Sequence, residues 1–152
     1  MFESWVDKWE GWGVEWGMTY TSDTIHEGGM RCHTIFHSPV REELWTDVAA
    51  DEGGCGEYPC PGDALAAVVA SCMLSMIAHT GKRKGFATEG IRIQATCGEG
   101  AQGVGSLVFE VTVPMKMSEL ERRLIEAAVA NCPVGNSLHP DIPKRMIWNW
   151  AE

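Results

Sequence analysis

This 152-residue chain contains no long uninterrupted apolar run, and its 12 Lys and Arg residues are outnumbered by 21 Asp and Glu residues. The longest apolar stretch, residues 64–78, is interrupted by Ser71, Cys72 and Ser75 and falls short of the roughly 20 residues that span a membrane, so we expect a buried core helix there. The net charge of -9 argues against nucleic-acid binding, which needs Lys and Arg clusters at the phosphates. The first residues lack a basic segment followed by an apolar one, which predicts a cytoplasmic protein without a secretory signal.

Motifs for metals and phosphates are also missing. Structural zinc sites use four ligands, and the chain has no Cys-x-x-Cys pair. Cys55 and Cys60 share a loop and could form a metal half-site, an oxidisable pair or an electron relay to Cys72, and we expect no metal. The glycine-rich segment Gly98 to Gly105 lacks the Lys-Ser/Thr of a phosphate loop and reads as a hairpin turn.

The composition is that of an ordinary globular protein. Hydrophobic residues make up 45% and charged residues 22%, and this length is sufficient for one well-buried core. We therefore expect a single domain, residues 1–152. Cysteines in a reducing cytoplasm are usually catalytic, metal-bound or redox-sensing, which directs attention to the six in this chain.

Hydrophobic periodicity predicts an α+β fold. A short helix is expected over residues 4–10, and a turn at Gly28-Gly29 joins the first two strands. A long helix over residues 63–80, apolar on nearly all sides and therefore central, is expected to stop at Gly81. Ser118 and Glu121 form a capping box that opens a second helix, which Pro133 ends near Cys132. Strands are predicted at residues 12–20, 30–37, 43–48, 90–97, 106–113 and 142–150.

Four tryptophans recur near the start of the chain: Trp5, Trp9, Trp12 and Trp16. Aromatic side chains carry much of the energy of cores and interfaces, so packing in the core or in a dimer is the first interpretation. An aromatic wall of a ligand pocket beside Cys72 is the alternative.

Cys72 and Cys132 are the candidate catalytic residues. A thiolate that attacks a peroxide becomes a sulfenic acid, and a neighbouring thiol can condense with it to form a disulfide. Cys72 lies too far into its helix to be activated by the helix dipole, and burial would raise its pKa, so it needs a cation from elsewhere. Cys132 is expected at a helix C-terminus, where a thiolate is disfavoured. The natural assignment makes Cys72 the nucleophile and Cys132 the resolving thiol.

The flanks of the two cysteines resemble the OsmC/Ohr family of thiol-dependent hydroperoxide reductases. The motifs are Pro61-x-x-x-Leu65-Ala-Ala-x-x-Ala-Ser-Cys72 and Cys132-Pro-Val-x-x-Ser-Leu138. Asp47 and Gly53-Gly54 resemble residues that precede the helix in many members. The resemblance implies an OsmC-like fold, with curved antiparallel sheets around two central helices in an intertwined homodimer.

The resemblance also implies an activity. Cys72 would reduce a small hydrophobic peroxide, Cys132 would resolve, and an external thiol, possibly a dithiol, would regenerate the pair without any cofactor. Hydroperoxide-reducing members commonly carry a Glu where Gly62 stands, paired with an Arg whose nearest counterparts here are Arg31 and Arg41. That departure leaves an alternative, a non-peroxidatic member that binds an apolar ligand or senses oxidation.

Overall fold

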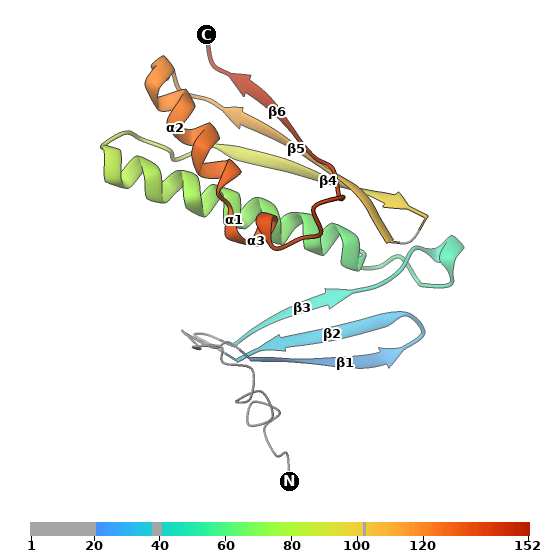
Figure 1. Ribbon diagram of the computed structural model, residues 1–152. Coiled ribbons are helices and arrows are strands. Elements are labelled where there is room, and N and C mark those ends of the chain that lie inside the picture. Colours follow the sequence, from blue (N-terminus) through green and yellow to red (C-terminus); the bar gives the residue numbers. More distant parts are fainter. Residues whose placement is uncertain (1–20, 38–40, 102) are drawn as a thin grey trace, which may run out of the picture.

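The computed structural model describes residues 21–37, 41–101 and 103–152, which form two three-stranded sheets and three α helices (Figure 1). The first sheet contains β1 (Ser22–Gly28), β2 (Arg31–Phe36) and β3 (Glu42–Thr46), and the second contains β4 (Arg92–Gly100), β5 (Gly103–Val113) and β6 (Lys144–Trp150). The helices in the described ranges are α1 (Pro61–Lys84), α2 (Glu119–Ala130) and α3 (Pro133–Asn136), and a 3-10 turn occupies Ala50–Glu52. This is the α+β architecture expected from the sequence.

The hairpin predicted at Gly28-Gly29 is confirmed, because β1 and β2 pair antiparallel across these two residues. The strand before this turn, β1, covers residues 22–28, and the sequence analysis did not predict a strand there. The helix predicted at residues 4–10, the strand at 12–20 and the four early tryptophans lie outside the described residues. The third predicted strand is confirmed as β3, which ends two residues earlier than expected.

Helix α1 is longer than predicted. Pro61 occupies its first turn, and the helix ends at Lys84 because Gly85 adopts a left-handed conformation with φ 81° and donates its N–H to the Gly81 carbonyl. The predicted stop at Gly81 is therefore wrong. Gly81 is buried within the helix, and a Cβ there would lie 2.5 Å from Thr88 Cγ2 and 2.8 Å from the Phe86 oxygen. Glycine is needed at this position so that the returning chain can pack against α1.

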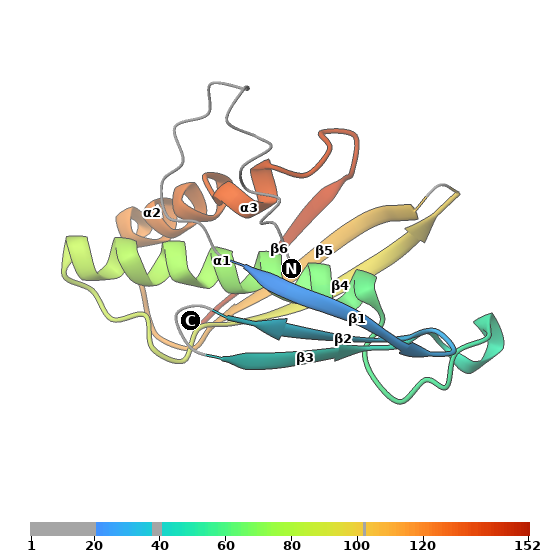
Figure 2. The ribbon, with the colours of Figure 1, turned by 90° about the horizontal axis from the view of Figure 1, so that it is seen from below.

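With 24 residues, α1 is also long and apolar enough to cross a membrane by length and composition, although its uninterrupted apolar stretch is shorter. Within the described residues it is the one helix that meets this test. One face of α1 packs against β4, β5, α2 and α3, which is the position of a core helix (Figure 2).

The second helix begins as predicted. The Ser118 hydroxyl accepts the Glu121 N–H at 3.3 Å, and the Glu121 carboxylate accepts the Ser118 N–H at 2.7 Å. This reciprocal capping box satisfies two of the free N–H groups of the helix terminus. The chain then turns at Asn131 and starts α3 at Pro133, a short helix that the sequence reading did not contain.

The second sheet is mixed, which corrects the expectation of purely antiparallel sheets. β4 and β5 form the predicted antiparallel hairpin, but both strands continue into its glycine-rich segment. β6 pairs parallel to β5, from Leu107 opposite Lys144 to Val113 opposite Trp150. The cause is the crossover through α2 and α3, which returns the chain to the end of the sheet where β5 began.

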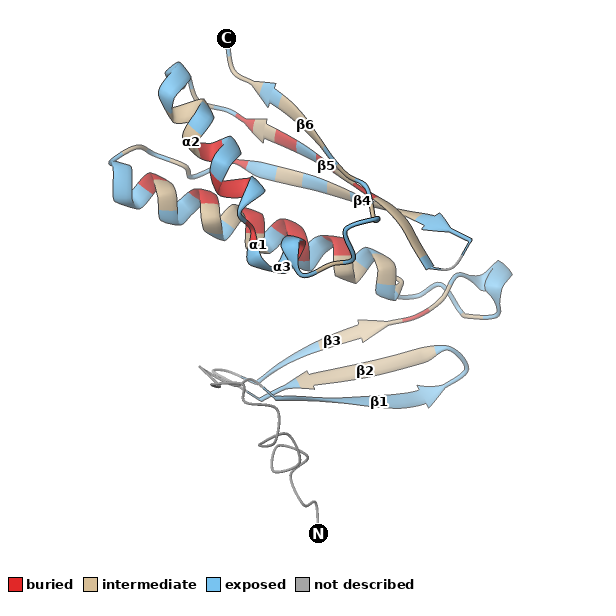
Figure 3. Ribbon diagram, in the orientation of Figure 1, coloured by how far each residue is buried: buried red, intermediate tan, exposed pale blue. Residues whose placement is uncertain are grey.

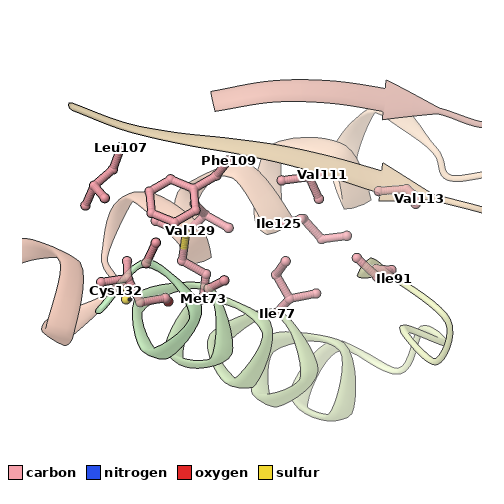
Figure 4. Close-up of a cluster of buried hydrophobic side chains, with 13 residues drawn as sticks. Met73, Ile77, Ile91, Leu107, Phe109, Val111, Val113, Ile125, Val129 and Cys132 are labelled. Carbon is pink, nitrogen blue, oxygen red and sulfur yellow. Dashed lines mark hydrogen bonds between the residues drawn. The ribbon is translucent and has the colours of Figure 1, made fainter. Parts of the chain in front are cut away.

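The core lies between the second sheet and the two long helices (Figure 4). Leu107, Phe109, Val111 and Val113 alternate along β5, are at most 1% exposed and face the buried side of α1. The first sheet has no comparable core: no residue of β1, β2 or β3 is buried (Figure 3). Three strands with two accessible faces need a covering surface to be stable.

Candidate thiol site

The structure brings Cys72 and Cys132 together. Cys72 lies half-buried in the middle of α1 and packs against the core cluster. Cys132 belongs to that cluster (Figure 4). The Cys132 thiol points toward the carbonyl oxygen of Val69, one helical turn before Cys72, with 4.0 Å between the sulfur and the oxygen. Two segments 60 residues apart in sequence therefore place two thiols at one site.

Cys132 differs from expectation in two respects. It follows α2, as predicted, but it is also the N-cap of α3, and its sulfur accepts the Gly135 N–H at 3.4 Å. It is also the more deeply buried thiol of the two, at 1% exposure. Burial raises its pKa, the Gly135 N–H opposes that rise, and the neighbouring Cys72 thiol adds to it. The net effect is a pKa of Cys132 above its usual value.

The expected activating cation is not found at this site. Over residues 21–37, 41–101 and 103–152, no Arg, Lys or His side chain donates a hydrogen bond to either sulfur. Arg31 is instead paired with Asp47 and Glu57. Arg41 lies exposed just before β3.

Asp47 organises the loop that leads from β3 into α1. It is 1% exposed, and its carboxylate accepts N–H groups from Val48 at 2.8 Å and from Cys55 and Glu57 at 3.4 Å. Burial opposes ionisation, but these three donors and Arg31 together hold the pKa of Asp47 below its usual range. This network accounts for the Asp47 motif noted in the sequence.

Gly54 completes the same loop. A Cβ on Gly54 would lie 1.8 Å from the carbonyl oxygen of Val48, so the two backbone segments can touch only because position 54 has no side chain. The second glycine of the Gly53-Gly54 motif is therefore required by close backbone approach.

An apolar cavity of about 400 Å³ opens beside Cys132. Met73, Val129, Met146 and Trp148 form much of its wall, and Lys144 and Glu126 contribute charged groups. A small apolar molecule with one polar end matches this lining. Cys132 lines this cavity, whereas Cys72 does not.

The two loop thiols have different surroundings. The Cys55 N–H is held by Asp47, whereas the Cys60 sulfur accepts the Asp63 N–H at the start of α1. Across the part of the chain that the structure describes, no three His, Cys, Asp or Glu residues converge as metal ligands. Twelve helical residues at 1.5 Å each separate Cys60 from Cys72 by about 18 Å, so the two thiols do not exchange directly within one chain, and a relay between them stays a prediction.

A comparison with protein families shows to which family the chain belongs. The family described as OsmC-like protein matches residues 53–145, which include both cysteine motifs. The chain belongs to the OsmC family. No curated protein sequence matches it.

Solved structures agree with this assignment. A proposed osmotic stress-induced and detoxification response protein from Psychrobacter arcticus is 27% identical, with a TM-score of 0.81 over 90% of this chain and 100% of that one. An organic hydroperoxide resistance protein from Elizabethkingia anophelis is 20% identical, with a TM-score of 0.73 over 91% and 100%. A third, the organic hydroperoxide resistance protein OhrB of Bacillus subtilis, is 17% identical, with a TM-score of 0.64 over 87% and 98%. The last two share the fold, and their names connect the family with peroxide stress.

Proposed function

We propose that this protein is a cytoplasmic thiol peroxidase that reduces organic hydroperoxides through Cys72 and Cys132, in defence against oxidative stress. The observation that carries the proposal is the convergence of the two thiols from α1 and from the junction of α2 with α3. Membership of the OsmC family supports it. No cofactor is required, because the two sulfurs supply both electrons.

The reaction balances with these two thiols alone. The Cys72 thiolate attacks the outer peroxide oxygen, the O–O bond breaks, and the alcohol leaves with a proton. The sulfur of Cys132 then attacks the Cys72 sulfenic acid, the S–O bond breaks, and water leaves as the disulfide forms. An external dithiol reduces the disulfide by exchange and restores both thiols.

Formation of the disulfide is expected to accelerate as the pH rises. The thiolate is the attacking species, and burial and Cys72 place the pKa of Cys132 above the ordinary value. Its thiolate fraction should therefore increase about tenfold per pH unit below that raised pKa. Stopped-flow measurement of disulfide formation after one equivalent of hydroperoxide, between pH 7 and 8.5, checks this. A rate that levels off below pH 8 would contradict it.

We further propose that the protein is a homodimer in which the first sheet of each chain is covered by the other chain. All of β1 is exposed, and exposed apolar side chains occur on the first sheet and on α1, namely Ile25 (46%), Phe36 (41%) and Val68 (53%). Val68 lies one turn before Cys72, so a covering partner would also shield the thiol site.

The homodimer predicts a mass of twice the 16.7 kDa of one chain in light scattering. Val68→Glu should convert the protein to monomer, because a buried unpaired charge disrupts an apolar interface. Leu120→Glu is the matched control, since Leu120 is 67% exposed and belongs to α2 rather than to the first sheet or α1. A monomeric wild type, or equal effects of the two variants, would contradict the proposal.

A direct assay tests the peroxidase. The protein is mixed with cumene hydroperoxide and a dithiol, and the consumption of peroxide is followed; rapid, repeated turnover is expected. A dithiol rather than a monothiol should be the better reductant, because its second sulfur completes the exchange within one molecule. Failure to consume more than one equivalent would remove the enzymatic proposal.

A non-peroxidatic ligand-binding protein is the second candidate. The apolar cavity of about 400 Å³ beside Cys132 favours it, as does Gly62 at the position where peroxidatic members commonly carry Glu. A Glu side chain at 62 would meet Cys97, whose sulfur lies 3.1 Å from the position of its Cβ. Micromolar binding of a fatty acid without peroxide turnover would establish this candidate instead.

A further inference from the structure

Two of the remaining cysteines converge at the N-terminal end of α1. Cys60 is the residue before the helix, and Cys97 lies on β4. A Cβ built on Gly62 would lie 3.6 Å from the Cys60 sulfur and 3.1 Å from the Cys97 sulfur. The two sulfurs are thus separated by no more than the sum of these distances, which side-chain rotation can close. Gly62 supplies the space that they share.

This pair is accessible to small reagents. A cavity of about 500 Å³ lies between the start of α1 and the β4–β5 hairpin, and Cys60, Gly62 and Cys97 are part of its lining. Both cysteines are half-buried. A peroxide or a dithiol can therefore reach them without unfolding of the chain.

The two sulfurs have different surroundings. The Asp63 N–H donates to the Cys60 sulfur at 3.4 Å, and this sulfur also faces the positive end of the α1 dipole. The pKa of Cys97 is raised by burial, and then by the nearby Cys60, Asp63 and Glu99. Cys97 is consequently the weaker thiolate, so Cys60, which lines the cavity and lies at the start of α1, is the one expected to attack the oxidant first.

We propose that Cys60 and Cys97 form a second, reversible disulfide, chemically separate from Cys72 and Cys132. The oxidant is a hydroperoxide. The sulfur of Cys60 attacks its outer oxygen, the O–O bond breaks and an alcohol leaves; Cys97 then attacks the Cys60 sulfenic acid and water leaves as the S–S bond forms. The two thiols lose the two electrons that the peroxide gains, and an external dithiol reverses the change.

The second pair acts on its own. Cys60 and Cys72 are about 18 Å apart along α1, too far for direct exchange within one chain. Its disulfide would link the start of α1 to β4 and so tether the loop that Asp47 organises. The pair is therefore a redox-sensitive cross-link between α1 and the second sheet, whether or not Cys72 is peroxidatic.

Peptide mapping of the full chain tests the proposal. The protein is treated with tert-butyl hydroperoxide, free thiols are blocked with N-ethylmaleimide, and trypsin is added. Residues 93–116 contain only Cys97, and residues 42–82 contain Cys60 together with Cys55 and Cys72. A cross-link between these two peptides is expected in the wild type and in Cys72→Ser, and it should disappear after treatment with dithiothreitol.

Matched variants identify the partner of Cys97. The cross-link should be lost in Cys60→Ser and in Cys97→Ser, and kept in Cys55→Ser, which removes an exposed thiol of the same loop. Gly62→Ala should slow its formation severalfold, because the new Cβ occupies the space between the sulfurs. Persistence of the cross-link in Cys60→Ser, or a Cys97 that stays fully alkylated after oxidation, would overturn the proposal.

Discussion

Cys72→Ser is expected to lower kcat/KM for an organic hydroperoxide by a factor on the order of 10³ or more, because a serine hydroxyl cannot replace the thiolate that breaks the O–O bond. Serine differs from cysteine by one atom, and Cys72 is only half-buried, so the fold should be retained. Peroxide consumption in the presence of a dithiol measures the loss, and circular dichroism confirms that the variant is folded.

Two controls separate the roles of the cysteines. In a Cys60→Ser background, Cys132→Ser should still reduce one equivalent of hydroperoxide, and the sulfenic acid on Cys72 should then accumulate and react with dimedone. Cys32→Ser, on β2, should keep the full rate. If Cys72→Ser remains within tenfold of the wild type, Cys72 is not the nucleophile.

Gly54→Ala should destabilise the protein by about 3 kcal/mol, at the upper end of what overpacking costs. The added Cβ would lie 1.8 Å from the Val48 carbonyl oxygen, so the backbone around Asp47 must move and its three N–H contacts are disturbed. The melting temperature should fall by about 10 °C for a domain of this size.

Gly29→Ala is the comparison for this prediction. Gly29 has φ 58° and open space around it, so alanine there incurs only backbone strain, about 1–2 kcal/mol. Thermal unfolding followed by circular dichroism compares the two variants. Equal shifts in melting temperature would show that the contact between Gly54 and Val48 has no special importance.

Local signals in the sequence were sufficient for much of the fold. The capping box at Ser118 and Glu121 and the turn at Gly28-Gly29 depend on neighbouring residues only, and both were predicted correctly. The end of α1 was not, because the role of Gly81 comes from its contact with Thr88 after the chain has turned back. The parallel pairing of β6 likewise depends on the path of a crossover, which periodicity does not record.

At the candidate site, too, local motifs could be predicted from the sequence and tertiary contacts could not. The motifs around Cys72 and Cys132 identified the pair, but the burial of Cys132 and its place at the start of α3 arise from tertiary packing. The pairing of Arg31 with Asp47 links β2 to the loop after β3 and had no signal in the sequence. The place of Cys97 has a local counterpart in the sequence, because Gly62 has no side chain and leaves room for the Cys97 sulfur beside it.

The parallel pairing of β5 with β6 has a consequence for the order of folding. The strands of the β4–β5 hairpin are adjacent in the chain, whereas β6 can add to β5 only after the segment between Val113 and Lys144 has closed on itself. Closure of such a segment is slower than hairpin formation, since entropy is lost before the contacts are gained. Cys132 lies within that segment. We therefore expect Cys72 and Cys132 to meet late, which would protect a newly made chain from premature oxidation between them.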